Sequence, residues 1–256
     1  MKLLILIATG FFLASTLHAQ IQLSASERDA LGKKIWQNES SGTVSGLTSW
    51  NKGEDFPSLG IGHFIWYPVG KRGPFEESFP GLVEFLQSRG KQPPAFVVAA
   101  LPKGCPWPNR AAFEAVRNGA EVTALRNFLA ASVPEQTDFL IARFNRAAPK
   151  LIAAAPAGER SAIEKRLSAV GASSRGAFAL VDYVNFKGEG FSLTERYKGE
   201  GWGLLQVLEA MTGKGDPVDD FSKASAAVLT RRVKNSPPER NEQKWLEGWT
   251  NRVGRY

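Results

Sequence analysis

The chain has 256 residues, of which 43% are hydrophobic and 22% are charged, and its formal net charge is +7. This composition is that of an ordinary globular protein and excludes a disordered or fibrous chain. Cys105 is the single cysteine, so an internal disulfide is excluded and the fold must be stabilised by its apolar core.

The first 19 residues have the pattern of a secretory signal peptide. Lys2 precedes the apolar run 3–14, and small residues around Ala19 suggest a cleavage site. We expect an exported protein, periplasmic or secreted, that keeps no integral membrane segment after cleavage; an uncleaved N-terminal anchor is the alternative. Loss of Lys2 lowers the charge from +7 to +6 on the single domain expected for 20–256. We expect anionic cell-wall polymers or membrane surfaces to attract such a protein, with a charge that serves only solubility as the equal alternative, and we do not expect nucleic acid as a partner.

The first predicted element after the signal peptide is a helix. Ser24 and Glu27 have the spacing of a capping box, and apolar residues at helical spacing continue to Glu39. The segment 40–75 is rich in glycine, β-branched and aromatic residues, which predicts short strands and loops. Helical periodicity then returns and predicts helices over 80–89, 94–101, 110–117, 121–131, 134–146, 159–170, 173–183, 201–211, 221–232 and 239–253. The predicted fold class is mainly α with a small β, Gly-rich subregion (α+β).

Glu39 stands at the C-terminal end of the first predicted helix. Exposed carbonyl groups make that position unfavourable for a negative charge. A carboxyl group placed there, beside Trp36, is a candidate general acid for glycoside cleavage. The alternative is a solvated glutamate at a helix end.

A glycine-alternating stretch follows, from Ser58 to His63. In a strand, Gly60 and Gly62 would leave bare backbone on one face, which would let a chain of sugars lie close to the protein. Ser58 and His63 flank this stretch as hydrogen-bonding groups. The alternative is a tight turn.

The stretch 58–63 resembles the Thr-x-Gly-x-Gly-His stretch of phage-type lysozymes, which in that family follows a helix ending in the catalytic glutamate. The Glu-Ser-x-Gly sequence that begins at Glu39 is similar to lytic transglycosylases of the lysozyme superfamily, in which a single glutamate acts. The resemblance covers about residues 36–64. It implies a lysozyme-like fold in which Glu39 protonates the glycosidic oxygen and Ser58 orients a water or a second carboxylate.

The second carboxylate is where this chain departs from the phage-type pattern. That family has an aspartate roughly midway between the glutamate and the threonine, whereas the nearest acids here are Glu54 and Asp55, four and three residues before Ser58. Either Glu54 or Asp55 stabilises the transition state or activates water, or Glu39 acts alone. Both acids are equally compatible with a solvated loop.

A polar stretch at 182–191 is a candidate second wall of a substrate cleft. It is faintly similar to the Tyr-Asn-x-Gly stretch of lytic transglycosylases, with one extra residue between Tyr183 and Asn185 and another before Gly188. We expect Asn185 to hold an N-acetyl group, Tyr183 to pack on a sugar face, and Glu189 to line the cleft, together with Gly60, Gly62 and His63. A helix cap packed on the core is the alternative.

Trp50, Trp66 and Tyr67 near the Gly-rich stretch are candidates for stacking on sugar rings, although Trp and Tyr also fill cores and a core position suits Trp66 at least equally well. Trp245 and Trp249, four residues apart in the last predicted helix, are predicted to lie in the core. No metal or cofactor is expected, because His63 is the only histidine beyond the signal peptide.

The sequence therefore predicts an exported, lysozyme-like monomer that binds and cleaves a β-1,4-linked amino-sugar polymer, expected to be peptidoglycan. A muramidase-like hydrolase and a lytic transglycosylase remain open, as do chitin and chitosan as substrates. The rival interpretation is a non-catalytic glycan-binding or cell-envelope protein, which the lack of a mid-spacing aspartate favours.

Overall fold

The computed structural model describes residues 20–73 and 75–256, so the predicted signal peptide lies outside the described residues. Among the described residues, 60% are in helices and 5% in strands, which confirms the mainly α prediction. None of the helices in the described part is both long and apolar enough to cross a membrane.

The first helix, α1 (Ala25–Ser40), begins as its sequence predicts. Ser24 accepts a hydrogen bond from the backbone N–H of Glu27, and the Glu27 side chain accepts one from the backbone N–H of Ser24. The helix ends where Ser41 adopts a left-handed conformation with φ 55°. Leu31 and Ile35 bury one face of α1, and Glu39 belongs to its last turn.

The Gly-rich region forms a small antiparallel sheet in the order β1-β2-β3. Its strands have two residues each and are β1 (Thr48–Ser49), β2 (Ser58–Leu59) and β3 (Phe64–Ile65), and a short 3₁₀ helix, η1 (Ser45–Leu47), precedes them. Residues 60–63 form the turn that joins β2 to β3. The interpretation of Gly60 and Gly62 as part of a strand is therefore wrong, and the alternative of a tight turn is confirmed.

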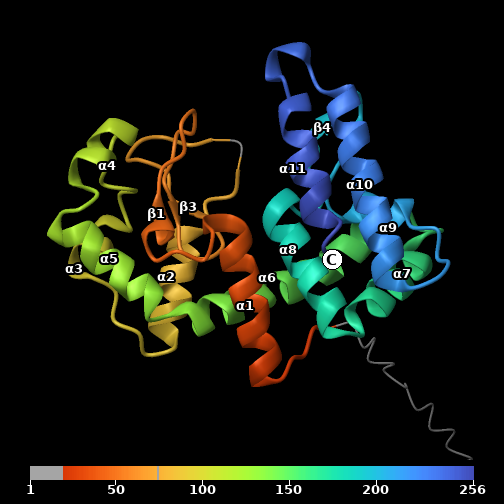
Figure 1. The fold of residues 1–256 in the computed structure, drawn as a ribbon, viewed down its shortest axis with the longest axis horizontal. Coiled ribbons are helices and arrows are strands. Elements are labelled where there is room, and N and C mark those ends of the chain that lie inside the picture. Colours follow the sequence, from red (N-terminus) through yellow and green to blue (C-terminus); the bar gives the residue numbers. More distant parts are fainter. Residues whose placement is uncertain (1–19, 74) are drawn as a thin grey trace, which may run out of the picture.

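The helices fall into two groups, which we call the first and second lobes (Figure 1). The first lobe combines the sheet with α2 (Phe79–Ser88), α3 (Ala95–Ala100), α4 (Arg110–Val116) and α5 (Ala120–Ala130). The second lobe consists of α7 (Arg160–Gly171), α8 (Ser174–Lys187), α9 (Leu204–Ala210), α10 (Pro217–Asn235), α11 (Gln243–Val253), the hairpin β4 (Arg196–Tyr197) and β5 (Glu200–Gly201), and the 3₁₀ helix η2 (Pro238–Arg240).

The long helix α6 (Val133–Ala154) joins the two lobes and contacts helices of both. The sequence pattern predicted that this helix ends at Arg146, but it continues through Pro149. A proline inside a helix costs about 3 kcal/mol. Burial of Leu151 and Ile152 on the extended face offsets this cost, since apolar side chains contribute about 1.5–3 kcal/mol each when buried.

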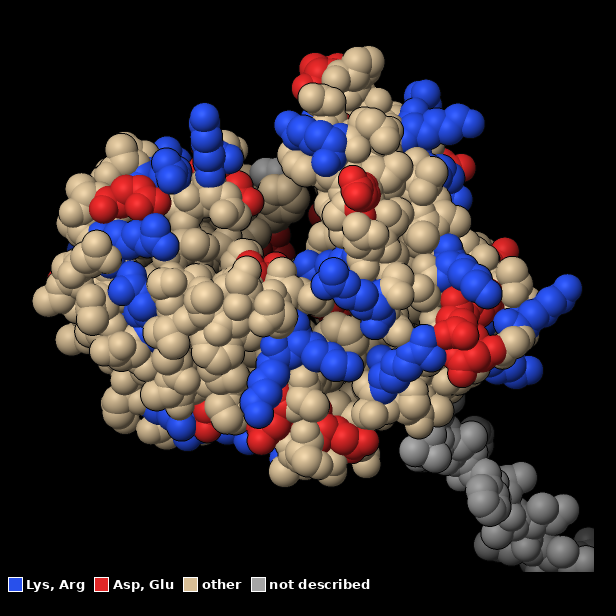
Figure 2. Space-filling model, in the orientation of Figure 1, with Lys and Arg blue, Asp and Glu red and all other residues tan. Residues whose placement is uncertain are grey.

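One hydrophobic cluster runs through both lobes. It includes Leu59 and Phe64 from the sheet, Phe144 from α6, and Leu180 and Phe221 from the second lobe. Because α6 contributes to this shared cluster, the lobes are fixed at their base. Above it, the molecule is hollowed between them (Figure 2).

Candidate functional site

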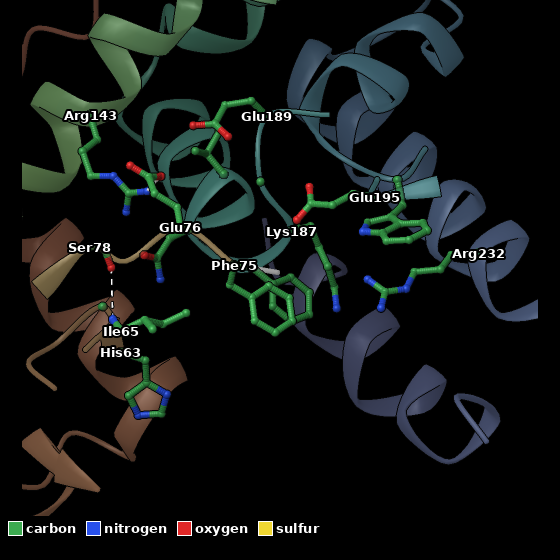
Figure 3. Close-up of a pocket in the computed structure, with 16 residues that line it drawn as sticks. His63, Ile65, Phe75, Glu76, Ser78, Arg143, Lys187, Glu189, Glu195 and Arg232 are labelled. Carbon is green, nitrogen blue, oxygen red and sulfur yellow. Dashed lines mark hydrogen bonds and ion pairs between the residues drawn. The ribbon is translucent and has the colours of Figure 1, made fainter. Parts of the chain in front are cut away.

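The groove between the lobes consists of two adjoining hollows, which together we call the central groove. The first has a volume of about 180 Å³ and lies between the turn after β2 and the end of α8 (Figure 3). The second has a volume of about 620 Å³ and is lined by residues 52–56 of the first lobe and by Tyr197 and Trp245 of the second. The two hollows share the lining residues Phe75, Glu195, Trp202 and Arg232.

Glu39 contacts two residues that line the first hollow. Asn185 donates a hydrogen bond from Nδ2 to Glu39 Oε1 at 3.1 Å, and Nδ1 of His63 lies 3.4 Å from Glu39 Oε2. Arg252 donates to Oε1 at 2.7 Å, so this oxygen has two donors, as an ionised carboxylate would. The fold thus brings together three residues that the sequence singled out, from α1, the β2–β3 turn and α8. The Glu39 side chain is 12% exposed.

Arg252 belongs to a buried network behind Glu39 that the sequence did not predict. Its Nε donates to Oδ2 of Asp182 at 2.9 Å and its Nη2 donates to Oδ1 at 2.7 Å. Asp182 is fully buried and also accepts hydrogen bonds from Tyr256 Oη at 2.7 Å and Asn38 Nδ2 at 3.2 Å. Burial alone would lower the pKa of Arg252, but Glu39 and Asp182 raise it above its ordinary value. Arg252 is therefore a fixed cation that orients Glu39.

Glu54 lies beside this site and lines the second hollow. Its Oε2 accepts a hydrogen bond from Asn51 Nδ2 at 3.2 Å and one from Ser58 Oγ at 3.5 Å. Burial, with a further contribution from the charge of Glu39, raises the pKa of Glu54, although the hydrogen bonds and His63 oppose the shift. The predicted pairing of Ser58 with a carboxylate is thus present. Asp55 lines the same hollow but its side chain is exposed.

The pKa of Glu54 predicts a pH-dependent cost in stability. The folded chain binds the Glu54 proton more tightly than the unfolded chain, whose pKa is 4.5, so folding loses stability as the pH rises through and above that value. We expect Glu54→Gln to match the wild type in melting temperature at about pH 4 and to exceed it at about pH 7. Thermal denaturation at both values tests this, with the exposed neighbour in Asp55→Asn as control. A lower melting temperature of Glu54→Gln at pH 7 would contradict the expectation.

The two glycines of the turn have different roles. Gly60 has φ 72°, and a Cβ atom there would meet Oε1 of the buried Gln136, so its predicted substrate role is wrong and it belongs to the core. The backbone N–H of Ile61 donates to the same Gln136 oxygen at 2.9 Å, which fixes the turn on α6. Gly62 does line the first hollow, and a Cβ atom there would lie 3.2 Å from Oδ1 of Asn185.

The structure also corrects the predicted role of Tyr183 as a residue that packs on a sugar face. Its side chain is fully buried, and its hydroxyl donates to the backbone carbonyl of Trp202 at 2.8 Å. Asn185 and Glu189, from the same predicted stretch, line the groove instead. Tyr183 is therefore a core residue that holds α8 against the segment before α9, and not a sugar platform.

We expect Tyr183→Phe to lower stability and leave substrate binding unchanged. Loss of the hydroxyl leaves the carbonyl of Trp202 without its donor, which costs about 1–2 kcal/mol. That is a fall of a few degrees in melting temperature for a chain of this size. Calorimetry and the KM for glycan would be measured together. A several-fold higher KM at an unchanged melting temperature would restore the substrate role.

Aromatic side chains divide between the core and the groove differently from the sequence prediction. Trp50 and Trp66 are 3% and 0% exposed and lie in the core, so neither is available for stacking. Trp245, predicted to be core, is 42% exposed and lines the second hollow. Trp249 contacts Lys187, whose Nζ lies 3.4 Å from its ring centroid. Burial, and next the charge of Arg232, lower the pKa of Lys187 well below its ordinary value.

Arg232 holds two aromatic side chains that line the second hollow, Trp202 and Tyr197, in place. Its guanidinium donates two hydrogen bonds to the fully buried carboxylate of Glu242, at 2.8 and 2.9 Å, and lies 4.1 Å from the ring centroid of Trp202. Tyr197 donates its hydroxyl to the same carboxylate at 2.9 Å. Because both partners of the ion pair are held by further contacts, Trp202 and Tyr197 present a preformed surface to the groove.

Two further kinds of reactive group are possible metal ligands and the single cysteine, Cys105. Among residues 20–73 and 75–256, no group of three or more His, Cys, Asp or Glu residues is placed to hold a metal ion. Cys105 is buried, and burial raises the pKa of its thiol to about 12, so it remains a thiol. The chemistry that the groove offers is that of carboxyl, imidazole, amide and guanidinium groups.

Comparison with known proteins gives no match to a family model, to a curated protein or to a solved structure. The function must therefore be argued from the residues of the groove.

Proposed function

We propose that this protein cleaves a β-1,4-linked amino-sugar glycan, with peptidoglycan as its substrate, and that Glu39 is the general acid. The observation that carries this proposal is the environment of Glu39. Its carboxylate contacts His63 and Asn185, which line the first hollow, while the cation of Arg252 holds it in place. A polymer in the groove would lie against these two partners of Glu39, next to a carboxyl group that three separate elements position.

The reaction needs an acid that protonates the glycosidic oxygen as the bond breaks. Glu39 must receive a proton before it can act, and His63 Nδ1, which faces Oε2 at 3.4 Å, is a group that can pass one to it. Asn185 can release Glu39 and use its amide for the N-acetyl group of a bound sugar. Tyr197 and Trp245 offer faces for sugar rings along the second hollow.

Glu54 is our candidate for the second carboxylate. It lies close enough to Glu39 for their charges to interact, and Ser58 and Asn51 hold it. In a hydrolase, Glu54 would activate the attacking water or stabilise the positive charge of the transition state. In a lytic transglycosylase, Glu39 would act alone and Glu54 would be dispensable.

A lysozyme-like fold is part of the same proposal. A helix that ends in a glutamate, a short sheet with a glycine turn and a second, helical lobe across a groove are the arrangement that the resemblance implies. We further propose that the protein is exported, that 20–256 is one domain, and that it acts as a monomer.

Digestion of purified peptidoglycan, followed by mass spectrometry of the soluble products, tests this function. New reducing ends would indicate hydrolysis, and 1,6-anhydro ends would indicate transglycosylation. We expect Glu54→Gln to abolish product in the first case and to spare it in the second. If the wild type releases no product from peptidoglycan, chitin or chitosan, the enzymatic proposal fails.

A non-catalytic glycan-binding protein is the second candidate, and the Glu39–Arg252 ion pair favours it. The pair occupies Oε1 of Glu39 at 2.7 Å and gives this carboxylate a structural role that needs no proton transfer. Co-sedimentation with insoluble cell walls, without release of soluble fragments, would support this function.

A further inference from the structure

A further pocket opens beside the central groove, and we call it the side pocket. Its volume is about 440 Å³, and it shares Glu76, Arg143, Glu189 and Glu195 with the first hollow, so the two are continuous. Figure 3 shows Arg143, Glu76 and Glu189 gathered at the end of the first hollow that leads into it.

One wall of the side pocket is basic. Arg143, Arg146 and Lys150 lie on α6 three and four residues apart, which places them on one face of the helix. Arg143 is held by Glu76 at 2.7 Å. Arg146 and Lys150 are exposed and form no ion pair with any residue that the structure describes. Two cations are thus free to bind a carboxylate.

The opposite wall is acidic. Glu189 and Glu195 come from the loop between α8 and β4, and neither forms an ion pair with the described residues. Burial, and next the charge of Glu189, raise the pKa of Glu195. The two carboxylates therefore repel each other across the space between them, and the charge of Arg232 offsets only part of the shift at Glu195. An ammonium group in that space would be stabilised by both.

We propose that the side pocket binds the zwitterionic end of a peptide carried by the glycan. The ammonium of a diamino acid would lie between Glu189 and Glu195, and its carboxylate would lie on Arg146 and Lys150. This inference rests on the proposed glycan-cleaving function and deepens it. The substrate class becomes peptide-bearing peptidoglycan, because chitin has no substituent with both charges.

Binding can be tested without catalysis. The probe is a soluble tripeptide of L-alanine, γ-D-glutamate and meso-diaminopimelate whose alanine nitrogen is blocked by a lactyl group, so that the diamino acid carries its single free amine; it is titrated into the full mature protein by calorimetry. We expect saturable binding that weakens about tenfold or more in Glu189→Gln/Glu195→Gln and in Arg146→Gln/Lys150→Gln. Acetylation of the free amine of the probe should weaken binding to the wild type but change little in the first double variant.

Two controls keep the result specific. Glu121→Gln/Lys223→Gln changes two exposed charges on α5 and α10, outside the groove and the side pocket, and should bind the tripeptide as the wild type does. Thermal denaturation of each variant excludes loss of fold. No binding of the tripeptide to the wild type, or equal binding of the acetylated probe, would overturn the proposal.

Cleavage measurements distinguish a failure of the side-pocket proposal from a failure of the proposed cleavage function. We expect a lower KM for peptide-bearing glycan strands than for strands stripped by an amidase, at a similar kcat, and we expect the double variants to lose that difference. Equal KM values for both strands in the wild type would refute the side pocket and leave the cleavage function intact. Tripeptide binding without cleavage of either strand would refute the cleavage function and leave the side pocket intact.

Discussion

Glu39→Gln is expected to abolish glycan cleavage and to leave the fold unchanged. A glutamine can still accept hydrogen bonds from Arg252 and Asn185, so the contacts of the site survive. It cannot deliver a proton, and general acid catalysis contributes roughly 10²–10⁴-fold to rate. Release of soluble fragments from cell walls measures the loss, and calorimetry measures the fold.

The matched control for this experiment lies on the same helix. Asp29 is exposed on α1, and Asp29→Asn makes the same chemical change far from the groove. Its activity should equal that of the wild type. Turnover by Glu39→Gln at the wild-type rate would exclude Glu39 as the general acid and direct attention to the other groove carboxylates, Glu54 and Glu195.

Arg252→Met is expected to cause the largest loss of stability. Asp182 is fully buried, and the substitution leaves its carboxylate with only the hydrogen bonds from Tyr256 and Asn38. Removing one partner of a buried ion pair costs about 3–5 kcal/mol. For a chain of this size, that is a fall on the order of 10 °C in melting temperature. Activity should also fall, because Glu39 loses the cation that orients it.

A second substitution distinguishes this cause from a general packing defect. Asp182→Asn combined with Arg252→Met removes the unpaired charge, so the double variant should be more stable than Arg252→Met alone. Lys223→Met, an exposed change on α10, should leave the melting temperature near that of the wild type. A double variant less stable than both single variants would contradict the electrostatic explanation.

Local signals predicted the elements of the fold well. The capping box at Ser24 and the apolar periodicity after it lie in α1 and the residue that caps it, so the start of the helix and the place of Glu39 at its end could be predicted. The turn at 60–63 could not be distinguished from a strand in this way. Its shape depends on Gln136 of α6, which lies 75 positions away from Ile61.

The sequence could predict that Tyr183 and Asn185 point in different directions, but only from the geometry of the helix that contains them. The two residues are two positions apart, and α8 extends beyond both, so they point to nearly opposite sides of the helix. One of them had to be buried if the other lined a groove. Which one is buried depends on the packing of α8 against α9 and α10, and this could not be predicted from the stretch itself.

The pairing of Arg252 with Glu39 gave no local signal at all, because the two residues are 213 positions apart. Such a contact forms only after the chain has paid the entropy of closing a very long loop. We therefore expect it to form late during folding, after the helices of each lobe have formed. The cleft would acquire its oriented acid only in the last stage of folding, so partly folded chains would carry every groove residue of the first lobe and still be inert.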